Sequence, residues 1–158
     1  MIPMDKYDIE KLKAVTLYIL KKCGATDYIH LFKILYFAER EHYADYGKRI
    51  IKDTFIAMEH DPVPSFLYNA LKLVTRQEQA NADSPLWTIA NAVTPGSAEL
   101  YYFFAAAEEP DMDELSNAEI ASLDNSIAEY RICRLGNCQR NLMMRHGMRH
   151  GMLFRILR

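Results

Sequence analysis

Long apolar runs and paired cysteines are both missing from this 158-residue chain, and each absence excludes a class of protein. No apolar run approaches the ~20 residues that a helix needs to span a bilayer, and residues 1–10 lack the apolar core of a secretory signal. The three cysteines, Cys23, Cys133 and Cys138, are too few for a disulfide framework, so we expect reduced thiols. The sequence therefore predicts a cytoplasmic protein with one hydrophobic core and no membrane contact.

Acidic residues are absent from the C-terminal part of the chain. Residues 131–158 contain seven Arg and no Asp or Glu, which leaves 12 basic and 21 acidic side chains in residues 1–130. An acidic body repels phosphate, which argues against nucleic acid as the main partner. The same charge favours a basic partner protein.

Sequence signatures of the common enzyme classes are absent as well. The chain has no glycine-rich phosphate loop and no HExxH motif. His42 and His60 lie near acidic residues, and a His–carboxylate pair can perform general acid–base catalysis. Because a charged helix surface produces such pairs by chance, we expect no catalytic residues and no cofactor.

A zinc-like pattern, Cys133-x4-Cys138-x7-His146-x3-His150, occurs in the basic segment. The four residue types suit zinc. The central gap is short for a C2H2 finger, however, and the usual apolar residues between the pairs are missing. We therefore assign no metal site.

Apolar side chains spaced three and four residues apart predict the first two helices. The first helix starts near Asp8, and Gly24 ends it. Thr26 is the expected cap of the second helix, which runs to about Tyr46 and stops at Gly47.

The second helix differs along its length. Residues 31–38 are nearly all apolar, which predicts a buried position at the centre of the fold, whereas residues 39–41 (Glu-Arg-Glu) predict a wetter end. Further helices are expected over residues 65–77, directly after a proline, and over residues 116–130, where a capping box begins the helix.

β-Branched and aromatic residues predict three short strands, over residues 49–58, 86–90 and 100–107. Turn residues at 94–97 join the last two strands. All three strands can form one small antiparallel sheet. The expected fold class is α+β and mainly helical, with about five helices and a two- to three-stranded antiparallel sheet packed at one side.

Four motifs follow one another in the order and spacing of a known domain. They are K-[LI]-L-Y-x-A at residues 33–38, an aromatic and histidine patch ending in Tyr-Gly at 42–47, [IP]-I-x-D-x-[FY]-x-A-[MW] at 50–58, and G-P-V-P-S-x-[LI]-Y at 61–68. A later L-S…E-I-x-x-L-D element matches within residues 115–130. The chain therefore resembles the Panacea domain of SocA-like antitoxins and of GepA-like phage-associated proteins.

The resemblance covers about residues 8–130. It implies that residues 1–130 form one Panacea-like domain and that residues 131–158 are an atypical basic tail. One position inside the best motif departs from the family, because Asp61 stands where the family has glycine. Glycine there suggests a positive φ or a close backbone contact, so we expect local strain or an altered turn at Asp61.

The resemblance also implies a function in binding. Panacea domains neutralise very different toxins by direct contact, and SocA-like members deliver a toxin to a protease as adaptors. The expected partners are a toxin protein and, for an adaptor, a protease. We expect contact at an exposed edge with His42, Tyr46, Asp61 and Pro62, although the Tyr-Gly and Pro-Val-Pro turns also serve the fold. A phage- or mobile-element-associated protein with a scaffold or regulatory role is the alternative.

The basic tail departs from the family most strongly. After Tyr130 the family continues with an ending of the type L-S-E-x-S-H-D-x-x-W on a last helix. Codons can be chosen for residues 137–147 that encode L-S-E-K-S-H-D-A-A-W when they are read from the third base of the first codon. We therefore hypothesise that residues from about 131 onward arise from a frameshift; a natural basic tail is the alternative. Loss of the last helix exposes apolar surface, which favours a homo-oligomer.

Sequencing of the DNA that encodes the chain tests the frameshift. We expect that a change of one base near codon 131 restores the family's ending. A DNA sequence in which no single-base change near this codon gives that ending contradicts the hypothesis.

Overall fold

The computed structural model describes residues 3–59, 61–75, 79–96 and 103–130. These parts of the chain contain five α-helices and one 3₁₀ helix: α1 (Lys6–Cys23), α2 (Tyr28–Tyr46), α3 (Ser65–Val74), α4 (Trp87–Ala90), η1 (Met112–Glu114) and α5 (Asn117–Tyr130). They also contain five short strands: β1 (Thr26–Asp27), β2 (Phe55–Ala57), β3 (Pro62–Pro64), β4 (Val93–Pro95) and β5 (Phe103–Ala106). The expected class, α+β and mainly helical with small antiparallel sheets, is confirmed.

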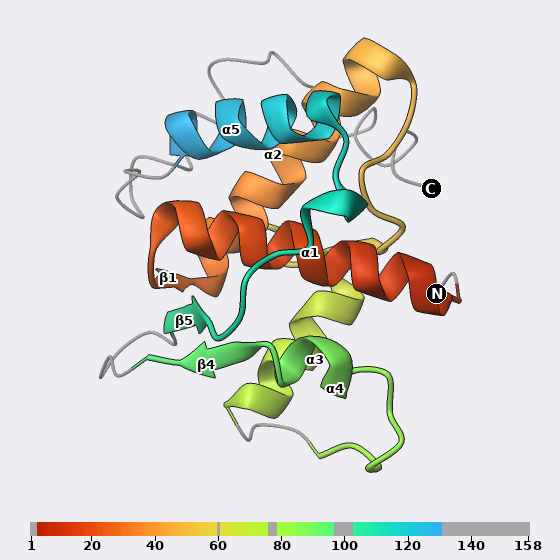
Figure 1. Cartoon of the computed structure of the whole chain (residues 1–158), viewed down its shortest axis with the longest axis vertical. Helices are drawn as coiled ribbons and strands as arrows, with labels where there is room; N and C mark the ends of the chain where they lie inside the picture. Colours follow the sequence, from red (N-terminus) through yellow and green to blue (C-terminus); the bar gives the residue numbers. More distant parts are fainter. Residues whose placement is uncertain (1–2, 60, 76–78, 97–102, 131–158) are drawn as a thin grey trace.

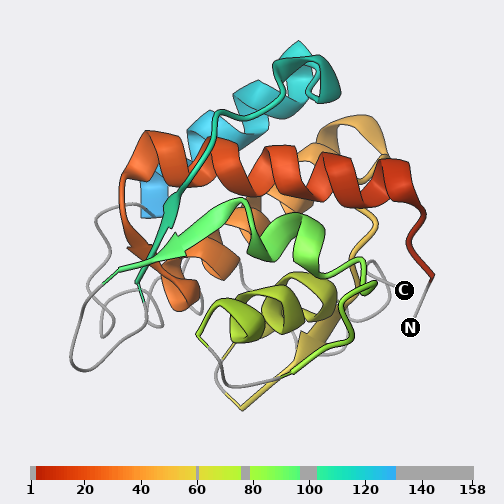
Figure 2. The same ribbon diagram turned by 60° about the horizontal axis from the view of Figure 1, so that its bottom comes forward.

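α2 forms the centre of the fold. Residues 31–38 are all buried, as their nearly continuous apolar character predicts. α1 crosses in front of α2 in Figure 1, with α5 above and with α3 and α4 below. Figure 2 shows α3, α4 and β4 on the side of α1 opposite to α5. Because other elements cover α2 on several sides, its side chains organise the hydrophobic core.

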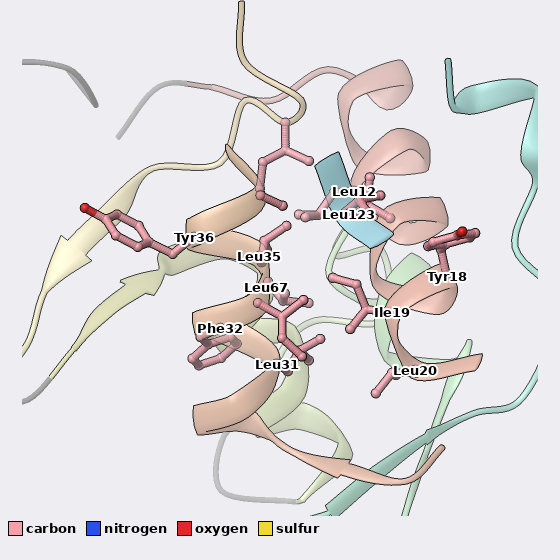
Figure 3. Close-up of a cluster of buried hydrophobic side chains, with 14 of the residues drawn as sticks. Leu12, Tyr18, Ile19, Leu20, Leu31, Phe32, Leu35, Tyr36, Leu67 and Leu123 are labelled. Carbon is pink, nitrogen blue, oxygen red and sulfur yellow. The ribbon is translucent and has the colours of Figure 1, made fainter. Parts of the chain in front are cut away.

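The core lies mainly between α1, α2 and α5. Leu12 and Ile19 of α1 face Leu31 and Leu35 of α2, and Leu123 of α5 lies beside them (Figure 3). All five side chains are fully buried. Burial of a leucine or isoleucine side chain contributes about 2 kcal/mol relative to exposure, so this layer is a major source of stability.

Helix caps set the boundaries of α1 and α2. Asp5 is the N-cap of α1, because its carboxylate accepts a bond from the Asp8 amide at 2.8 Å and Asp8 accepts one from the Asp5 amide in return. α1 thus begins before Asp8, where the sequence placed its start. The predicted cap Thr26 is also wrong: Thr26 lies in β1, and the carboxylate of Asp27 accepts the bond from the His30 amide. The predicted end at Gly47 is confirmed by its left-handed backbone, with φ of 66°.

The strands form two sheets rather than one. β5 lies between β1 and β4, whereas β2 pairs only with β3 among the described strands, with Ile56 opposite Val63. The prediction that residues 49–58 join the other strands is therefore wrong, and only Phe55–Ala57 of that segment is a strand. The chain reverses directly after β2, which brings the Pro-Val-Pro segment beside it. Because a residue that precedes proline favours an extended backbone, this segment can pair with β2 as a strand.

Residues 86–90 differ most from the sequence prediction. The expected strand is the short helix α4, which begins when the amides of Trp87 and Thr88 bond to the carbonyls of Ser84 and Pro85. Proline favours the first turn of a helix, and this local start outweighs the β propensity of Trp-Thr-Ile. The strand expected within residues 100–107 is confirmed over Phe103–Ala106.

An ion pair joins α1 to the start of α5. Lys11 Nζ lies 2.6 Å from Glu119 Oε1, and Glu119 Oε2 accepts a bond of 2.9 Å from the Ser116 amide, which completes the predicted capping box. Burial raises the pKa of Glu119. The hydrogen bond and charge of Lys11 and the hydrogen bonds with Ser116 lower it by more than burial raises it, so the pKa lies below its ordinary 4.5. The ionised carboxylate therefore stabilises the folded state.

We predict that Glu119→Gln makes the free energy of unfolding depend less on pH in the acidic range. Because the folded pKa of Glu119 is depressed, its contribution is present above the ordinary pKa and is lost as the pH falls through the folded value. The amide keeps the cap but not the charge, so the variant should lose about 1 kcal/mol of unfolding free energy at pH 7. Urea denaturation at pH 7 and pH 3 measures this. An unchanged difference between wild type and variant at the two pH values contradicts the assignment.

Candidate partner-binding site

His42 occupies a different environment from the one that the sequence predicted. Its side chain is 5% exposed, and Nδ1 lies 3.3 Å from the hydroxyl of Ser122 in α5. Its ring also packs on Tyr46 with 4.7 Å between centroids. The expectation of an exposed edge at His42 is therefore wrong, because His42 continues the helix face of Leu31 and Leu35, and α5 covers that face.

Tyr46 is exposed at the C-terminal end of α2. Its side chain is 55% exposed, and Tyr43 one turn earlier is also exposed. Asp61 and Pro62 lie elsewhere, in the hairpin of β2 and β3, which contacts the first half of α2. Lys33, which pairs with Asp61, precedes Tyr46 by thirteen residues of helix, or about 20 Å. The structure therefore brings His42 close to Tyr46 and Asp61 close to Pro62, but it does not unite the four.

Asp61 compensates a buried charge. Lys33 of α2 is almost fully buried, and its Nζ lies 3.5 Å from Asp61 Oδ1. The carbonyl of Asp61 also accepts the amide of Met58 and closes the hairpin at 3.2 Å. An unpaired buried ammonium costs several kcal/mol, so a carboxylate in place of glycine at this position supplies a partner for Lys33.

Glu39 is a buried acid on α2. Its side chain is 1% exposed, and Oε1 accepts the amide of Ile51 at 2.6 Å while Oε2 accepts Nε of Arg49 at 3.2 Å. Burial raises the pKa of Glu39, and these donors act against that rise. The prediction that residues 39–41 form a wetter end is wrong at Glu39. The carboxylate instead fixes the chain that follows α2.

Asp53 holds the same segment to α3. Oδ1 of Asp53 accepts the amide of Phe66 at 2.9 Å and the hydroxyl of Ser65 at 3.2 Å, and Oδ2 accepts the amide of Leu67 at 2.9 Å. Pro64, the residue at the N-cap position, makes no side-chain cap bond, so Asp53 caps α3 from a distant part of the chain. Burial raises the pKa of Asp53 although these donors lower it.

These contacts explain the two most specific motifs. The Asp of the 50–58 motif bonds to the Ser of the 61–68 motif and to the helix that the serine begins. Sequence reasoning missed this role of Asp53 and the burial of Glu39. The sequence did contain a signal. The helix predicted after Pro64 has no capping side chain at its N-cap position, and Asp53 is an acid in the strand-like run before it.

The hairpin also exposes apolar side chains that sequence reasoning did not single out. Ile56 is 50% exposed and Met58 53% exposed, and both lie on the same face because they are two residues apart. Phe55, on the opposite face, is buried against Tyr36 with 5.5 Å between ring centroids. Residues 55–58 are all apolar, so no alternating pattern in the sequence could have revealed which of these side chains are exposed.

Other predicted sites receive no structural account. His60 and the zinc-like pattern Cys133, Cys138, His146 and His150 lie outside the described residues, as does the whole basic tail. Within the described ranges, no group of three or more His, Cys, Asp or Glu side chains could hold a metal ion. No helix in those ranges has the length and apolar character needed to cross a bilayer.

Comparison with known proteins gives one match. The sequence model of a family described as "Antitoxin SocA-like, Panacea domain" matches residues 31–134. This range includes α2 from Leu31 onward, all of α3, α4 and α5, and all of the motifs described above. No curated protein and no solved structure matches the chain.

We predict that Asp53→Asn destabilises the fold by about 2 kcal/mol, because an amide NH₂ must then face an amide donor in a buried site. Asp45→Asn, at an exposed position on α2, is the control and should change stability by less than about 0.5 kcal/mol. Urea denaturation followed by circular dichroism measures both. Equal midpoints for Asp53→Asn and Asp45→Asn contradict the capping role.

Proposed function

Because the chain belongs to the family of SocA-like antitoxins with a Panacea domain, we propose that it binds a cognate toxin protein and neutralises it by direct contact. The family assignment supports an antitoxin-type role. The finer steps are our inference: the chain acts without catalysis, by covering the toxin or by delivering it to a protease. It does so in the cytoplasm.

The use of the motif residues supports a role without catalysis. The acids Glu39 and Asp53 accept structural bonds from backbone amides, and Asp61 pairs with Lys33. A catalytic acid or base needs access to a reacting group. Since these carboxylates are engaged in holding the scaffold, the residues that remain for function are those exposed on its surface.

Charge and exposed apolar side chains support a protein partner. Residues 1–130 carry 21 acidic and 12 basic side chains, which favours a basic toxin. Tyr43 and Tyr46 are exposed at one end of α2, and Ile56 and Met58 are exposed on the hairpin. Tyrosine and methionine are enriched at protein interfaces, so both regions are suited to contact.

A growth assay tests the proposal. We expect that the protein encoded beside this chain's gene stops bacterial growth when it is produced alone, and that co-production of this chain restores growth. The two proteins should also co-purify. A Leu35→Asp variant, which places a charge in the core, should not restore growth.

The alternative role, in a phage or mobile element, predicts a different result. If the neighbouring protein is harmless when it is produced alone, or does not bind this chain, the antitoxin proposal is wrong. For the adaptor mechanism, the half-life of the bound toxin should lengthen in a strain without the protease. An unchanged half-life leaves direct occlusion as the mechanism.

A further inference from the structure

The β2–β3 hairpin has two edges of different chemistry. In an antiparallel pair, alternate residues direct their amides and carbonyls toward the partner strand. Ser65 N donates to the Thr54 carbonyl at 2.9 Å, and Met58 N donates to the Asp61 carbonyl at 3.2 Å. With Ile56 opposite Val63, residues 54, 56 and 58 therefore face β3. The amides and carbonyls of Phe55 and Ala57 point away from it.

The outer edge of β3 is closed to another strand. Pro62 and Pro64 lie opposite Ala57 and Phe55, so their nitrogens face outward, and proline has no amide hydrogen. The outer edge of β2 is open, because Phe55 and Ala57 have amides and belong to a sheet of only two strands within the described residues. An open edge with unpaired amides is a template for an additional strand.

Side chains beside the open edge are apolar and exposed. Ile56 and Met58 are 50% and 53% exposed on the outer face of β2. Phe55 anchors the inner face to α2 through Tyr36, which points toward the hairpin in Figure 3. Lys33 pairs with Asp61 directly before β3, and Asp53 bonds to Ser65 directly after it, so both ends of β3 are fixed. The edge is therefore held rigidly while its apolar face stays accessible.

We propose that an extended segment of the toxin adds to the free edge of β2, pairs with the backbone of Phe55 and Ala57, and packs apolar side chains on Ile56 and Met58. This deepens the proposed function and rests on it. Strand addition supplies affinity through the main chain, so it places few demands on the partner's sequence. The acidic excess of residues 1–130, with 21 acidic and 12 basic side chains, favours a segment of a basic toxin as the occupant.

Paired variants test the backbone contact. Ala57→Pro removes the outward amide, whereas Ala57→Val keeps it at the same exposed position. The partner is the toxic neighbouring protein of the growth assay, and the affinity is measured by calorimetry with purified proteins. We expect Ala57→Pro to weaken binding at least about tenfold and Ala57→Val by less than about threefold, because the lost amide leaves a carbonyl of the added strand unpaired.

A second pair tests the apolar face. Met58→Asp should weaken binding about tenfold, whereas Met112→Asp, at a 45%-exposed position on η1, should not weaken it. Thermal unfolding of each variant checks that the fold is kept. In the complex with wild-type chain, the amide hydrogens of Phe55 and Ala57 should exchange at least about tenfold more slowly than in the free chain, a readout that needs no variant.

The outcomes separate the two proposals. If wild type does not bind the neighbouring protein, the proposed function fails and the edge contact fails with it. If wild type binds and neutralises it but Ala57→Pro binds equally well, the function stands and the edge contact is wrong. Dimerisation of the free chain that Ala57→Pro abolishes makes a second copy the occupant and also overturns the proposal. Retained binding by Ala57→Val, with loss for Ala57→Pro and Met58→Asp, supports it.

Discussion

The hydrogen bonds of the buried Asp53 carboxylate hold the segment after α2, with its hairpin, to the start of α3. The carboxylate accepts three hydrogen bonds from residues 65–67, at the end of α3 where the amides have no partner within the helix. Ionised carboxylates are favoured at that end of a helix, which offsets part of the cost of burial. Glu39 of α2 likewise holds the beginning of this segment, because its carboxylate accepts the amide of Ile51. Together the two acids hold residues 49–67 against α2.

This arrangement changes how the family motifs are interpreted. The most recognisable residues of the chain, from the 33–38 motif to the Pro-Val-Pro-Ser element, mostly build and fix the scaffold. In our proposal, partner recognition falls to side chains and backbone at the surface, such as Ile56 and the edge of β2. A scaffold that is fixed internally can carry different surface residues without loss of the fold.

The sequence was informative where local signals decide the structure. The end of α2 at Gly47 and the capping box of α5 depend on residues a few positions apart, and both predictions are confirmed. The buried centre of α2 followed from its continuous apolar run. Predictions failed where tertiary contacts decide. Glu39 bonds to Arg49 and Ile51, and His42 lies against Ser122 of α5, so both polar residues are buried. The pairing of β2 with a Pro-Val-Pro strand has no alternating pattern to reveal it, and α4 formed despite β-favouring residues.

Amide hydrogen exchange measured by NMR on the free chain tests the central role of the buried acids most directly. First-turn amides of a helix normally exchange quickly, because they have no helical partner. The account predicts that the amides of Ile51, Phe66 and Leu67 exchange as slowly as that of Leu35 in the centre of α2, by global unfolding alone. Exchange of these three amides at the rate of the exposed residues 81–83 contradicts it.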